Sequence, residues 1–401
     1  MGPSDWKLQR LEDLITKFDA GVSVNSDDRP AGEGEFGVLK VSAVTEGIFR
    51  PGENKFITGT ERTRACVNPK RDRLIMSRAN TPELVGATAY IDRDYPNIFL
   101  SDKLWQFEPR SDGKISMRWL GQVLASPAYR KRLGEIATGS SQSMKNISQD
   151  AVMRLELPVP PLEEQHWLAS TLGLWDVAID KTERLIAAKV QNNDSLTTRL
   201  YVLSDRKGQR TRFSELLKES MVSGTSGLHA KKITVKLYGK GVLAKVNQRQ
   251  GSAKTQYFVR RAGQLIFSKL DFLNGAFGII PPEIDGYEST LDLPAFDISA
   301  SVNAVWLLGY LTRPAYYTQQ VGLARGQRKA RRVHPSDLLA STLHVPPYAL
   351  QNLFAEMLAA SRRDINSTKC LLELLKIQKR GLMQKLLSGQ WQVKSPETEA
   401  A

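Results

Sequence analysis

Leu157-Pro-Val-Pro-Pro-Leu162 and Leu343-His-Val-Pro-Pro-Tyr348 are two copies of one stretch, 186 residues apart. At the same offset Gln165 matches Gln351, and the identities continue without a gap for more than thirty-five residues beyond the two prolines. Self-similarity at a fixed offset is the sequence signature of an internal repeat, so the chain contains one structural unit twice. The further identities are Ala169 with Ala355, Leu172 with Leu358, Ile179 with Ile365, Thr182 with Thr368, Leu185 with Leu371, Leu196 with Leu382, and Leu200 with Leu386.

A helical pattern follows each Val-Pro-Pro. Apolar residues recur at alternating spacings of four and three, which is typical of the a/d seam of a coiled coil. Prolines suit a helix start, where a missing N–H costs nothing, and Ser388-Gly389 suits a helix end. Two unrelated surface helices stay an alternative, but the shared register favours mutual packing. We therefore expect two long antiparallel helices that pack together, imperfectly at Asn192-Asn193. The expected packing residues are Leu168, Leu172, Trp175, Ile179 and Ile186 in the first helix, and Phe354, Leu358, Ile365, Leu372 and Leu382 in the second.

The segments before each Val-Pro-Pro match more loosely. Trp119 aligns with Trp306, Pro127-Ala128-Tyr129 aligns with Pro314-Ala315-Tyr316, and Arg73-Leu-Ile-Met-Ser-Arg78 resembles Gln264-Leu-Ile-Phe-Ser-Lys269. Short β-branched and aromatic runs between Gly and Pro turns predict strands, and we expect one short helix in each domain. The expected strands are 37–41, 73–76, 232–238, 256–259 and 264–267, and the expected short helices are 119–133 and 302–321.

The pattern therefore predicts an α+β fold with two strand-rich domains, two long antiparallel helices that form a coiled coil, and a pseudo-twofold internal repeat. The expected boundaries are residues 1–157 for the first domain, 158–204 for the first helix, 205–343 for the second domain, 344–390 for the second helix, and 391–401 for a flexible tail.

Composition favours a polyanionic partner. Lys and Arg together number 56 against 42 Asp and Glu, a net charge of +14. Such a surplus attracts nucleic acid, although charge alone is weak evidence. Two distant cysteines, Cys66 and Cys370, exclude a disulfide framework, and the four histidines show no metal-ligand spacing. We see no signal peptide and no apolar run near the roughly 20 residues of a membrane span, so we expect a cytoplasmic protein.

The motifs that would carry chemistry are missing or out of context. Gly32-Glu-Gly-Glu-Phe-Gly37 satisfies a dinucleotide fingerprint, but it follows a polar stretch and precedes a strand-like run, so we interpret it as a loop. The sequence contains no Walker A motif, and no Asn-Pro-Pro-aromatic or Asp-Pro-Pro-aromatic tetrapeptide of an amino-methyltransferase. We therefore expect no catalytic site, cofactor or metal in this chain.

Basic and polar loops are the candidate DNA-binding elements. Arg325-Gly-Gln-Arg-Lys-Ala-Arg-Arg332 is the densest basic cluster, and Gly139-Ser-Ser-Gln-Ser-Met-Lys145 lies at the matching place in the first half. Gly permits close backbone approach to phosphate, and Arg can bond guanine in a bidentate manner. The predicted DNA-binding residues are Arg71, Arg73, Arg78, Ser140, Ser141, Gln142, Lys145, Lys236, Lys240, Lys269, Arg325, Gln327, Arg328, Lys329, Arg331 and Arg332.

These features together resemble the specificity subunits of type I restriction-modification systems. Leu157-Pro-Val-Pro-Pro-Leu-Glu-Glu-Gln165 resembles the proline-proline-x-x-glutamate-glutamine start of that family's conserved helices. Lys379-Arg-Gly-Leu-Met-Gln-Lys-Leu-Leu-Ser-Gly389 resembles the end of its distal helix, and Thr138-Gly139-Ser140 with Asn146-Ile147 resembles the loop before each helix. The second copy departs from the pattern, because Tyr348-Ala349-Leu350-Gln351 keeps the Gln but lacks the Glu-Glu.

The resemblance implies a non-catalytic subunit whose two target-recognition domains each read one half of a split, asymmetric double-stranded DNA target. It implies two methyltransferase subunits that modify adenine N6 with S-adenosylmethionine, and two restriction subunits that use ATP and Mg²⁺ to translocate and cut DNA. These cofactors would belong to the partners. Two other classes stay open: a non-enzymatic DNA-binding scaffold of another defence or chromosome system, and a relative of a single-chain restriction-methylation enzyme.

The helix length suggests a mechanism for the unread spacer between the half-sites. A helix of about 40 residues spans roughly 60 Å, and one turn of DNA advances about 34 Å. Two antiparallel helices of this length can hold two domains about a turn apart, so we expect them to act as a ruler. A pseudo-twofold axis would suit the antiparallel strands of duplex DNA.

Overall fold

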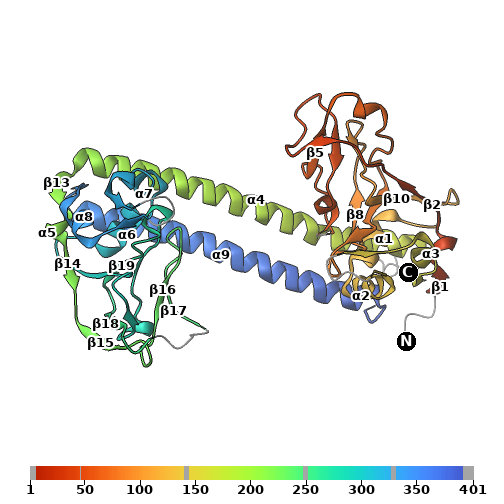
Figure 1. The fold of residues 1–401 in the computed structure, drawn as a ribbon. Coiled ribbons are helices and arrows are strands. Elements are labelled where there is room, and N and C mark those ends of the chain that lie inside the picture. Colours follow the sequence, from red (N-terminus) through yellow and green to blue (C-terminus); the bar gives the residue numbers. More distant parts are fainter. Residues whose placement is uncertain (1–5, 46, 140–143, 247–251, 327–330, 392–401) are drawn as a thin grey trace. The chain divides into compact units, whose positions relative to one another are not determined.

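The computed structural model describes residues 6–45, 47–139, 144–246, 252–326 and 331–391. It contains two compact units, one made of residues 1–185 and 368–401 and the other of residues 186–367 (Figure 1). Helix α4 (Leu162–Lys207) begins in the first unit and ends in the second, and helix α9 (Tyr348–Leu387) does the reverse. Among the described residues, no helix combines the length and the apolarity needed to span a membrane.

The first unit is built on an antiparallel four-stranded sheet in the order β2-β10-β6-β8. It also contains a second four-stranded sheet in the order β3-β5-β4-β9. Helices α1 and α2 follow the last strand of the first sheet and contribute Trp119, Leu120 and Leu133 to the main core. The strands and helices of this unit before α4 are β1 (Lys7–Arg10), β2 (Ile15–Ala20), β3 (Ser26–Asp27), β4 (Gly37–Leu39), β5 (Asn54–Ile57), β6 (Arg73–Ser77), β7 (Ala79–Asn80), β8 (Thr88–Ile91), β9 (Ile98–Phe99), β10 (Leu104–Pro109), α1 (Met117–Ala125), α2 (Pro127–Ile136), β11 (Lys145–Asn146), α3 (Gln149–Met153) and β12 (Glu156–Val159).

The second unit repeats the first sheet and replaces the second one. Its antiparallel sheet β14-β22-β19-β20 has the strand order of β2-β10-β6-β8, whereas its outer strands form a three-stranded sheet β15-β18-β21 and a hairpin β16-β17. The elements of this unit between α4 and α9 are β13 (Gln209–Arg212), α5 (Phe213–Leu216), β14 (Leu217–Ser220), β15 (Ser223–Ser226), β16 (Ile233–Val235), β17 (Val242–Ala244), β18 (Gln256–Val259), β19 (Leu265–Phe267), β20 (Phe277–Ile279), β21 (Glu288–Ser289), β22 (Ala295–Ile298), α6 (Ala304–Leu311), α7 (Pro314–Tyr317), β23 (Ala324–Arg325), β24 (Arg332–Val333), α8 (Pro335–Ala340) and β25 (Thr342–Val345).

The predicted α+β class and internal repeat are confirmed, but the single short helix expected in each domain is wrong. Residues 119–133 fall in two helices, α1 and α2, and residues 302–321 contain α6, α7 and a 3-10 turn. In each unit a proline, Pro127 or Pro314, begins the second helix. Proline cannot donate the backbone hydrogen bond that would continue the first helix, and its ring clashes with the preceding turn, so the chain must restart.

The repeat also begins earlier than the Val-Pro-Pro alignment indicated. Strand β1 pairs with β12 just before α4, and β13 pairs with β25 just before α9. At the last residue of β1 and of β13, the backbone N–H of an arginine donates to an acid three residues on: Arg10 to Asp13 and Arg212 to Glu215. These arginines are 202 residues apart rather than 186, which explains why a search at one offset misses them.

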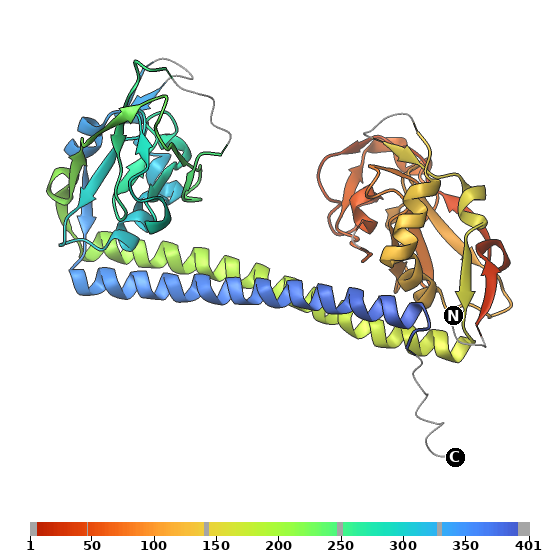
Figure 2. The ribbon, with the colours of Figure 1, turned by 90° about the horizontal axis from the view of Figure 1, so that it is seen from below.

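The seam of α4 and α9 keeps the 4-3 spacing, and the helices run antiparallel in both units (Figure 2). In the first unit, Asp176 pairs with Lys379 while the later Glu183 pairs with the earlier Lys376. In the second, Lys189 Nζ lies 2.7 Å from Asp364 Oδ1. Of the predicted packing residues, the buried ones are Leu168, Leu172, Ile179, Phe354, Leu358 and Ile365, and the half-buried ones are Trp175, Ile186, Leu372 and Leu382.

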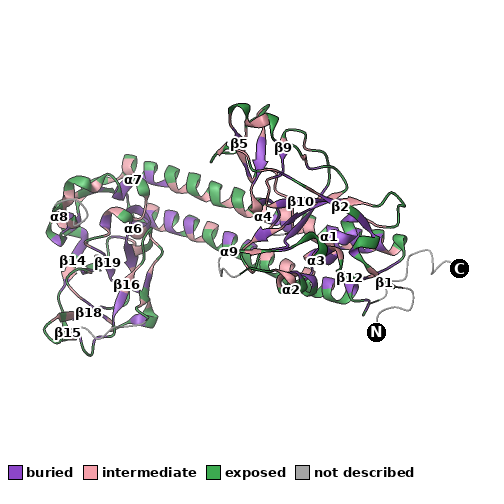
Figure 3. Ribbon diagram, turned by 45° about the vertical axis from the view of Figure 1, so that its right-hand side comes forward, coloured by how far each residue is buried: buried purple, intermediate pink, exposed green. Residues whose placement is uncertain are grey.

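The alternation of buried and exposed turns along both helices is visible in Figure 3. The expected irregularity of the seam falls on Asn193, which occupies a seam position and is half-buried, whereas Asn192 is exposed. The Oδ1 atom of Asn193 is buried without a hydrogen-bond partner among the described residues. A polar seam residue costs stability but can specify the register of the pairing.

A buried glutamine fastens each helix to its own domain. Gln165 Oε1 accepts the backbone N–H of Ser116, the N-cap of α1, at 2.8 Å, and its Nε2 donates to Lys114 O and Pro160 O. In the second unit Gln351 Oε1 accepts the N–H of Asn303, the N-cap of α6, at 2.7 Å, and its Nε2 donates to Pro346 O. Both glutamines are 1% exposed. The repeated Gln is therefore retained where the Glu-Glu before it is not, because it joins helix to domain.

Replacing this glutamine should weaken the junction. Gln165→Ala leaves one buried N–H and two carbonyls without their partner, and we expect a loss of about 2–3 kcal/mol in the free energy of unfolding of the first unit. The measurement is guanidinium unfolding followed by tryptophan fluorescence. Gln378→Ala, at an exposed position of α9, is the matched control and should change stability by less than about 0.5 kcal/mol. Equal effects of the two substitutions would contradict this role.

Candidate DNA interface

In the second unit, the predicted basic residues gather at one end of the four-stranded sheet. Strand β19 ends at Phe267, β20 begins at Phe277, and residues 268–276 connect them at that end. Lys269 lies in this connection, and its carbonyl accepts the backbone N–H of Val333, the residue that follows the basic cluster. Arg332, the last residue of the cluster, is thereby held near the sheet end that carries Lys269.

The first unit has the same construction. Arg78 follows β6 directly, and its carbonyl accepts the backbone N–H of Ile147, which follows the polar loop 139–145. The N–H of Arg78 donates to Lys103 O, as the N–H of Lys269 donates to Asp292 O. The equivalence of Arg78 and Lys269 was indicated by the sequence alignment, and the matching hydrogen bonds give its physical basis.

The side chains at these two sheet ends differ in how far they are engaged. Arg78 Nε donates to Asp102 O at 2.7 Å, and Lys145 Nζ donates to Gly139 O at 2.6 Å. Arg325 forms an ion pair with Asp337, Arg332 Nε lies 3.6 Å from Asp292, and Arg331 is exposed. Six predicted residues lie outside the described residues, namely Ser140, Ser141, Gln142, Gln327, Arg328 and Lys329.

Arg71 and Arg73 lie at the opposite end of the first unit's sheet. Strand β6 begins at Arg73, which pairs with Ile91, the last residue of β8. Both Nε and Nη2 of Arg73 donate to the Glu108 carboxylate, at 3.0 and 2.6 Å, so its guanidinium joins β6 to β10. Gln264 and Asp297 make the equivalent cross-strand contact in the second unit. The structure therefore brings Arg78 and Lys145 together, but it does not bring Arg71 and Arg73 to them.

Lys236 and Lys240 belong to the tip of the β16-β17 hairpin and are exposed. The tip is held to the connection 268–276, because the N–H of Tyr238 donates to Asn274 O and the N–H of Gly239 donates to Gly275 O. These lysines therefore lie at the same sheet end as Lys269. The sequence could not reveal this, because they are 29 or more positions away from Lys269.

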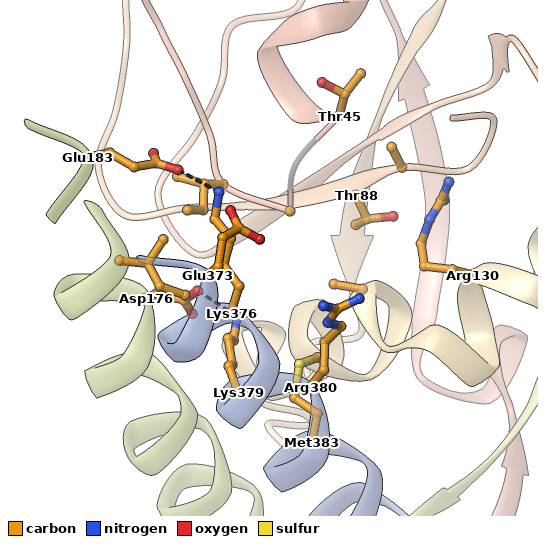
Figure 4. A pocket seen from close by; sticks show the side chains of 15 residues that line it. Thr45, Thr88, Arg130, Asp176, Glu183, Glu373, Lys376, Lys379, Arg380 and Met383 are labelled. Atoms are coloured by element: carbon orange, nitrogen blue, oxygen red, sulfur yellow. Dashed lines mark hydrogen bonds and ion pairs between the residues drawn. The ribbon is translucent and has the colours of Figure 1, made fainter. Parts of the chain in front are cut away.

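Asp176 and Glu183 of α4, with Lys379 and Lys376 of α9, form a carboxylate clamp that the sequence analysis missed (Figure 4). The same two carboxylates also bond side chains of the first domain. Asp176 Oδ1 accepts from Lys379 Nζ on α9 at 2.5 Å, and its Oδ2 accepts from Gln122 Nε2 on α1 at 2.6 Å. Glu183 lies seven residues further on, on the same helix face. Its two oxygens accept from Lys376 Nζ and Arg50 Nη2, each at 3.0 Å.

The electrostatics of this clamp favour the ionised form of Glu183. Partial burial acts to raise the pKa of Glu183, but the hydrogen bonds from Lys376 and Arg50 outweigh it and hold the pKa below its ordinary value. The signal in the sequence was Lys379, a charged residue at a seam position of the second helix, with acids one heptad apart on the first helix. Position 362, the repeat equivalent of Asp176, is an arginine, so the pattern does not appear twice.

The second unit is joined to its helix by aromatic contacts instead. Tyr201 of α4 is fully buried, and its hydroxyl donates to Trp306 O at 2.9 Å. The Arg313 guanidinium lies over the rings of Tyr201 and Tyr310, at 4.5 and 4.1 Å from their centroids. The two junctions share the glutamine but use different second contacts.

The clamp of the first unit lines a cleft of about 500 Å³ between its domain and the helices. Thr88, Arg130 and Met383 contribute to its walls, and Arg380 reaches into it (Figure 4). Arg130 donates to the carbonyls of Val85 and Glu83, so it orders the connection that leads into β8. The described residues contain no group of three or more His, Cys, Asp or Glu that could hold a metal ion.

Comparisons with known proteins agree with this architecture. Residues 3–189 match the family model of the type I restriction modification DNA specificity domain. Over 171 residues the chain is 27% identical to the type I restriction enzyme EcoEI specificity subunit of Escherichia coli, and the match covers 42% of this chain and 29% of that relative's length.

Two solved structures have a similar fold over almost the whole chain. The S subunit of a type I restriction-modification system from M. genitalium aligns with a TM-score of 0.55 and 13% identity, covering 97% of both chains. A chain from a study of complex assembly and conformational transition of the type I R-M system aligns with a TM-score of 0.58 and 15% identity, covering 98% of this chain and all of the other.

Residues 3–189 thus belong to the family of type I restriction modification DNA specificity domains. The second unit repeats the four-stranded sheet β2-β10-β6-β8 of this domain as β14-β22-β19-β20, and we call these two the inner sheets. It also repeats the attachment of the domain to a long helix, and the whole chain has the fold of a type I specificity subunit. The resemblance indicated by the Pro-Pro motifs is confirmed, and the alternative of a scaffold from another system is not favoured.

The clamp yields a prediction about the rigidity of the first unit. Asp176→Ala would leave Lys379 unpaired with only 15% of its side chain exposed, and we expect it to lower the free energy of unfolding by about 2 kcal/mol. Asp180→Ala removes an exposed pair with Arg184 one turn away, and should cost less than about 0.5 kcal/mol. Denaturant unfolding of both variants measures the difference. A cost at Asp180 that matches the cost at Asp176 would show that the clamp contributes nothing specific.

Proposed function

We propose that this chain is the DNA specificity subunit of a type I restriction-modification system, in which each unit reads one half of a bipartite target. The observation that carries the proposal is the duplicated construction: the same inner sheet, the same buried glutamine, and a basic connection at the same sheet end. Two DNA-reading units that are attached in the same way to antiparallel helices suit a duplex whose strands are antiparallel. The net charge of +14 supports phosphate contact.

The two half-sites should differ in sequence. The inner sheets of the two units share one strand order, whereas the outer sheets β3-β5-β4-β9 and β15-β18-β21 do not. The repeated inner sheet supports each DNA-reading unit, and the elements that differ between the units are free to contact different base edges. Phosphate contacts then position each unit, and base contacts specify the sequence.

The chemistry is assigned to partner subunits. Methyltransferase subunits would bind S-adenosylmethionine and methylate adenine N6, after the adenine is turned out of the duplex into their own pocket. Restriction subunits would use ATP and Mg²⁺. This chain would recognise the target sequence in the DNA and provide a surface that binds the partner subunits.

The exposed side of the coiled coil in the first unit is a suitable docking surface for a methyltransferase subunit. With the buried seam at heptad positions a and d, Asp176, Glu183 and Lys376 occupy position e and contact the domain or line its cleft. Positions e and g flank the seam on opposite sides. The g and neighbouring c positions carry exposed leucines, which are Leu174 (71% exposed), Leu185 (48%), Leu371 (49%) and Leu374 (56%).

The docking surface makes a prediction. Leu174→Glu combined with Leu374→Glu places two charges in the apolar patch, and we expect at least a tenfold loss of affinity for the methyltransferase subunit, because burying an unpaired charge at an interface is costly. Co-purification and isothermal titration measure it. Val305→Glu, an equally polar change at an exposed position of α6 (51% exposed), is the control and should leave binding unchanged. Wild-type binding by the double variant would rule this surface out.

The function itself is tested by mapping methylated adenines in a genome that carries the system, with and without this chain. We expect one split motif with two unlike halves, which disappears when the chain is deleted. Unchanged methylation in the deletion strain would overturn the proposal.

The same mapping tests whether the helices set the spacer. Insertion of four residues after Lys189 lengthens α4 by about 6 Å, which corresponds to at most about two base pairs. We expect a longer spacer between unchanged half-sites. An altered half-site with an unchanged spacer would contradict the role of the helices as a ruler.

A further inference from the structure

The tip of the β16-β17 hairpin presents an aromatic side chain in an unusual backbone conformation. Tyr238 has a φ of 58°, and apart from Asp72 it is the only non-glycine residue with a positive φ in the described part of the chain. The left-handed region is unfavourable for a bulky L-residue, and such conformations concentrate at functional sites. The Tyr238 side chain is 60% exposed, so burial of the ring in the core does not compensate for the backbone cost.

The surrounding turn holds Tyr238 firmly in this conformation. Its own N–H donates to Asn274 O at 2.9 Å, and the N–H of Gly239 donates to Gly275 O at 2.8 Å. Gly239 is required here, because its φ is 65° and a Cβ at this position would lie 2.8 Å from Thr312 Cγ2. The backbone that carries the tyrosine ring is therefore fixed by hydrogen bonds to the connection 268–276.

The chemical surroundings of the ring favour nucleic acid as its occupant. Lys236 and Lys240 flank it, and Lys240 Nζ lies 6.0 Å from the ring centroid. Leu237 (36% exposed) and Leu243 (52% exposed) provide apolar contact area on the same hairpin. Cationic side chains that pair with phosphate, placed beside a ring that can contact the edge of a base pair, suit the surface of duplex DNA.

The hairpin tip also lies at the sheet end already assigned to DNA. The connection 268–276 binds the tip through Asn274 and Gly275, and it carries Lys269, whose carbonyl holds the end of the basic cluster. We propose that Tyr238 contacts the DNA directly and packs its ring against the edge of a base pair in the half-site read by the second unit. This inference rests on the proposed function and names a specificity-determining residue within it.

The test uses the full chain assembled with its methyltransferase subunit and a duplex that carries the mapped target. Fluorescence anisotropy gives the affinity of the wild type and of Tyr238→Phe, Tyr238→Ala and Tyr238→Asn. We expect Tyr238→Phe to bind within about twofold of wild type and Tyr238→Ala to lose about tenfold or more, because the contact between the ring and a base edge is lost. Tyr348→Ala, at a tyrosine of similar exposure (49%) on α9, should bind normally.

Two further readouts separate a base contact from other roles. Tyr238→Asn should lose affinity as Tyr238→Ala does while its melting temperature stays equal or rises, since Asn tolerates the left-handed conformation. The salt dependence of binding should be unchanged in Tyr238→Ala and reduced by about one unit of slope in Lys240→Ala.

The possible failures are distinguishable. If the wild-type complex does not prefer its mapped target to a scrambled duplex, the proposed function fails. If the wild type shows that preference and Tyr238→Ala binds equally well, the function stands and this inference is overturned. If Tyr238→Ala instead loses its methyltransferase subunit, the ring contacts protein, and the inference is likewise overturned.

Discussion

A buried glutamine side chain at the start of each long helix is the contact on which both units depend. Gln165 and Gln351 each accept the backbone N–H of an N-cap residue in the domain. Each also donates to the carbonyl of the proline five residues before it. One side chain thus fixes both the entry of the chain into the helix and the place of the domain on it. Because both partners are backbone groups, the domain surfaces can diverge without disturbing the junction.

This division of labour explains why the units are alike inside and unlike outside. The inner sheets share one strand order, and the carbonyls of Arg78 and Lys269 receive equivalent hydrogen bonds. The outer sheets differ, and so do the secondary contacts with the helices: charged side chains around Asp176 in one unit and the rings of Tyr201 and Tyr310 in the other. The proposed function accounts for this difference, because the outer sheets can differ between two half-sites while the frame that positions the two units stays the same.

The sequence allowed the repeat, the α+β class and the helix seam to be predicted, because spacing and identity at a fixed offset are local in the chain. It did not reveal that Gln165 bonds Ser116, since the two are 49 residues apart. Nor did it separate Arg73, which joins β6 to β10 through Glu108, from Arg78, five residues on and at the other end of the strand. Prolines 127 and 314 were seen as identities, but their effect of splitting a helix was overlooked. Strand pairing and sheet ends are tertiary facts, and no single-sequence pattern encodes which charges they bring together.

The central claim is that the same end of the inner sheet faces DNA in both units. It is tested most directly by site-specific photocrosslinking of the assembled complex to its target duplex. A crosslinking amino acid at Thr81 lies in the connection from β6 to β8, and one at Leu270 lies in the connection from β19 to β20. A crosslinking amino acid at Arg71 or Ala262 lies at the opposite sheet end of its unit. The account predicts crosslinks to DNA from Thr81 and Leu270 and none from the other two. Crosslinks from Arg71 and Ala262 alone would contradict it.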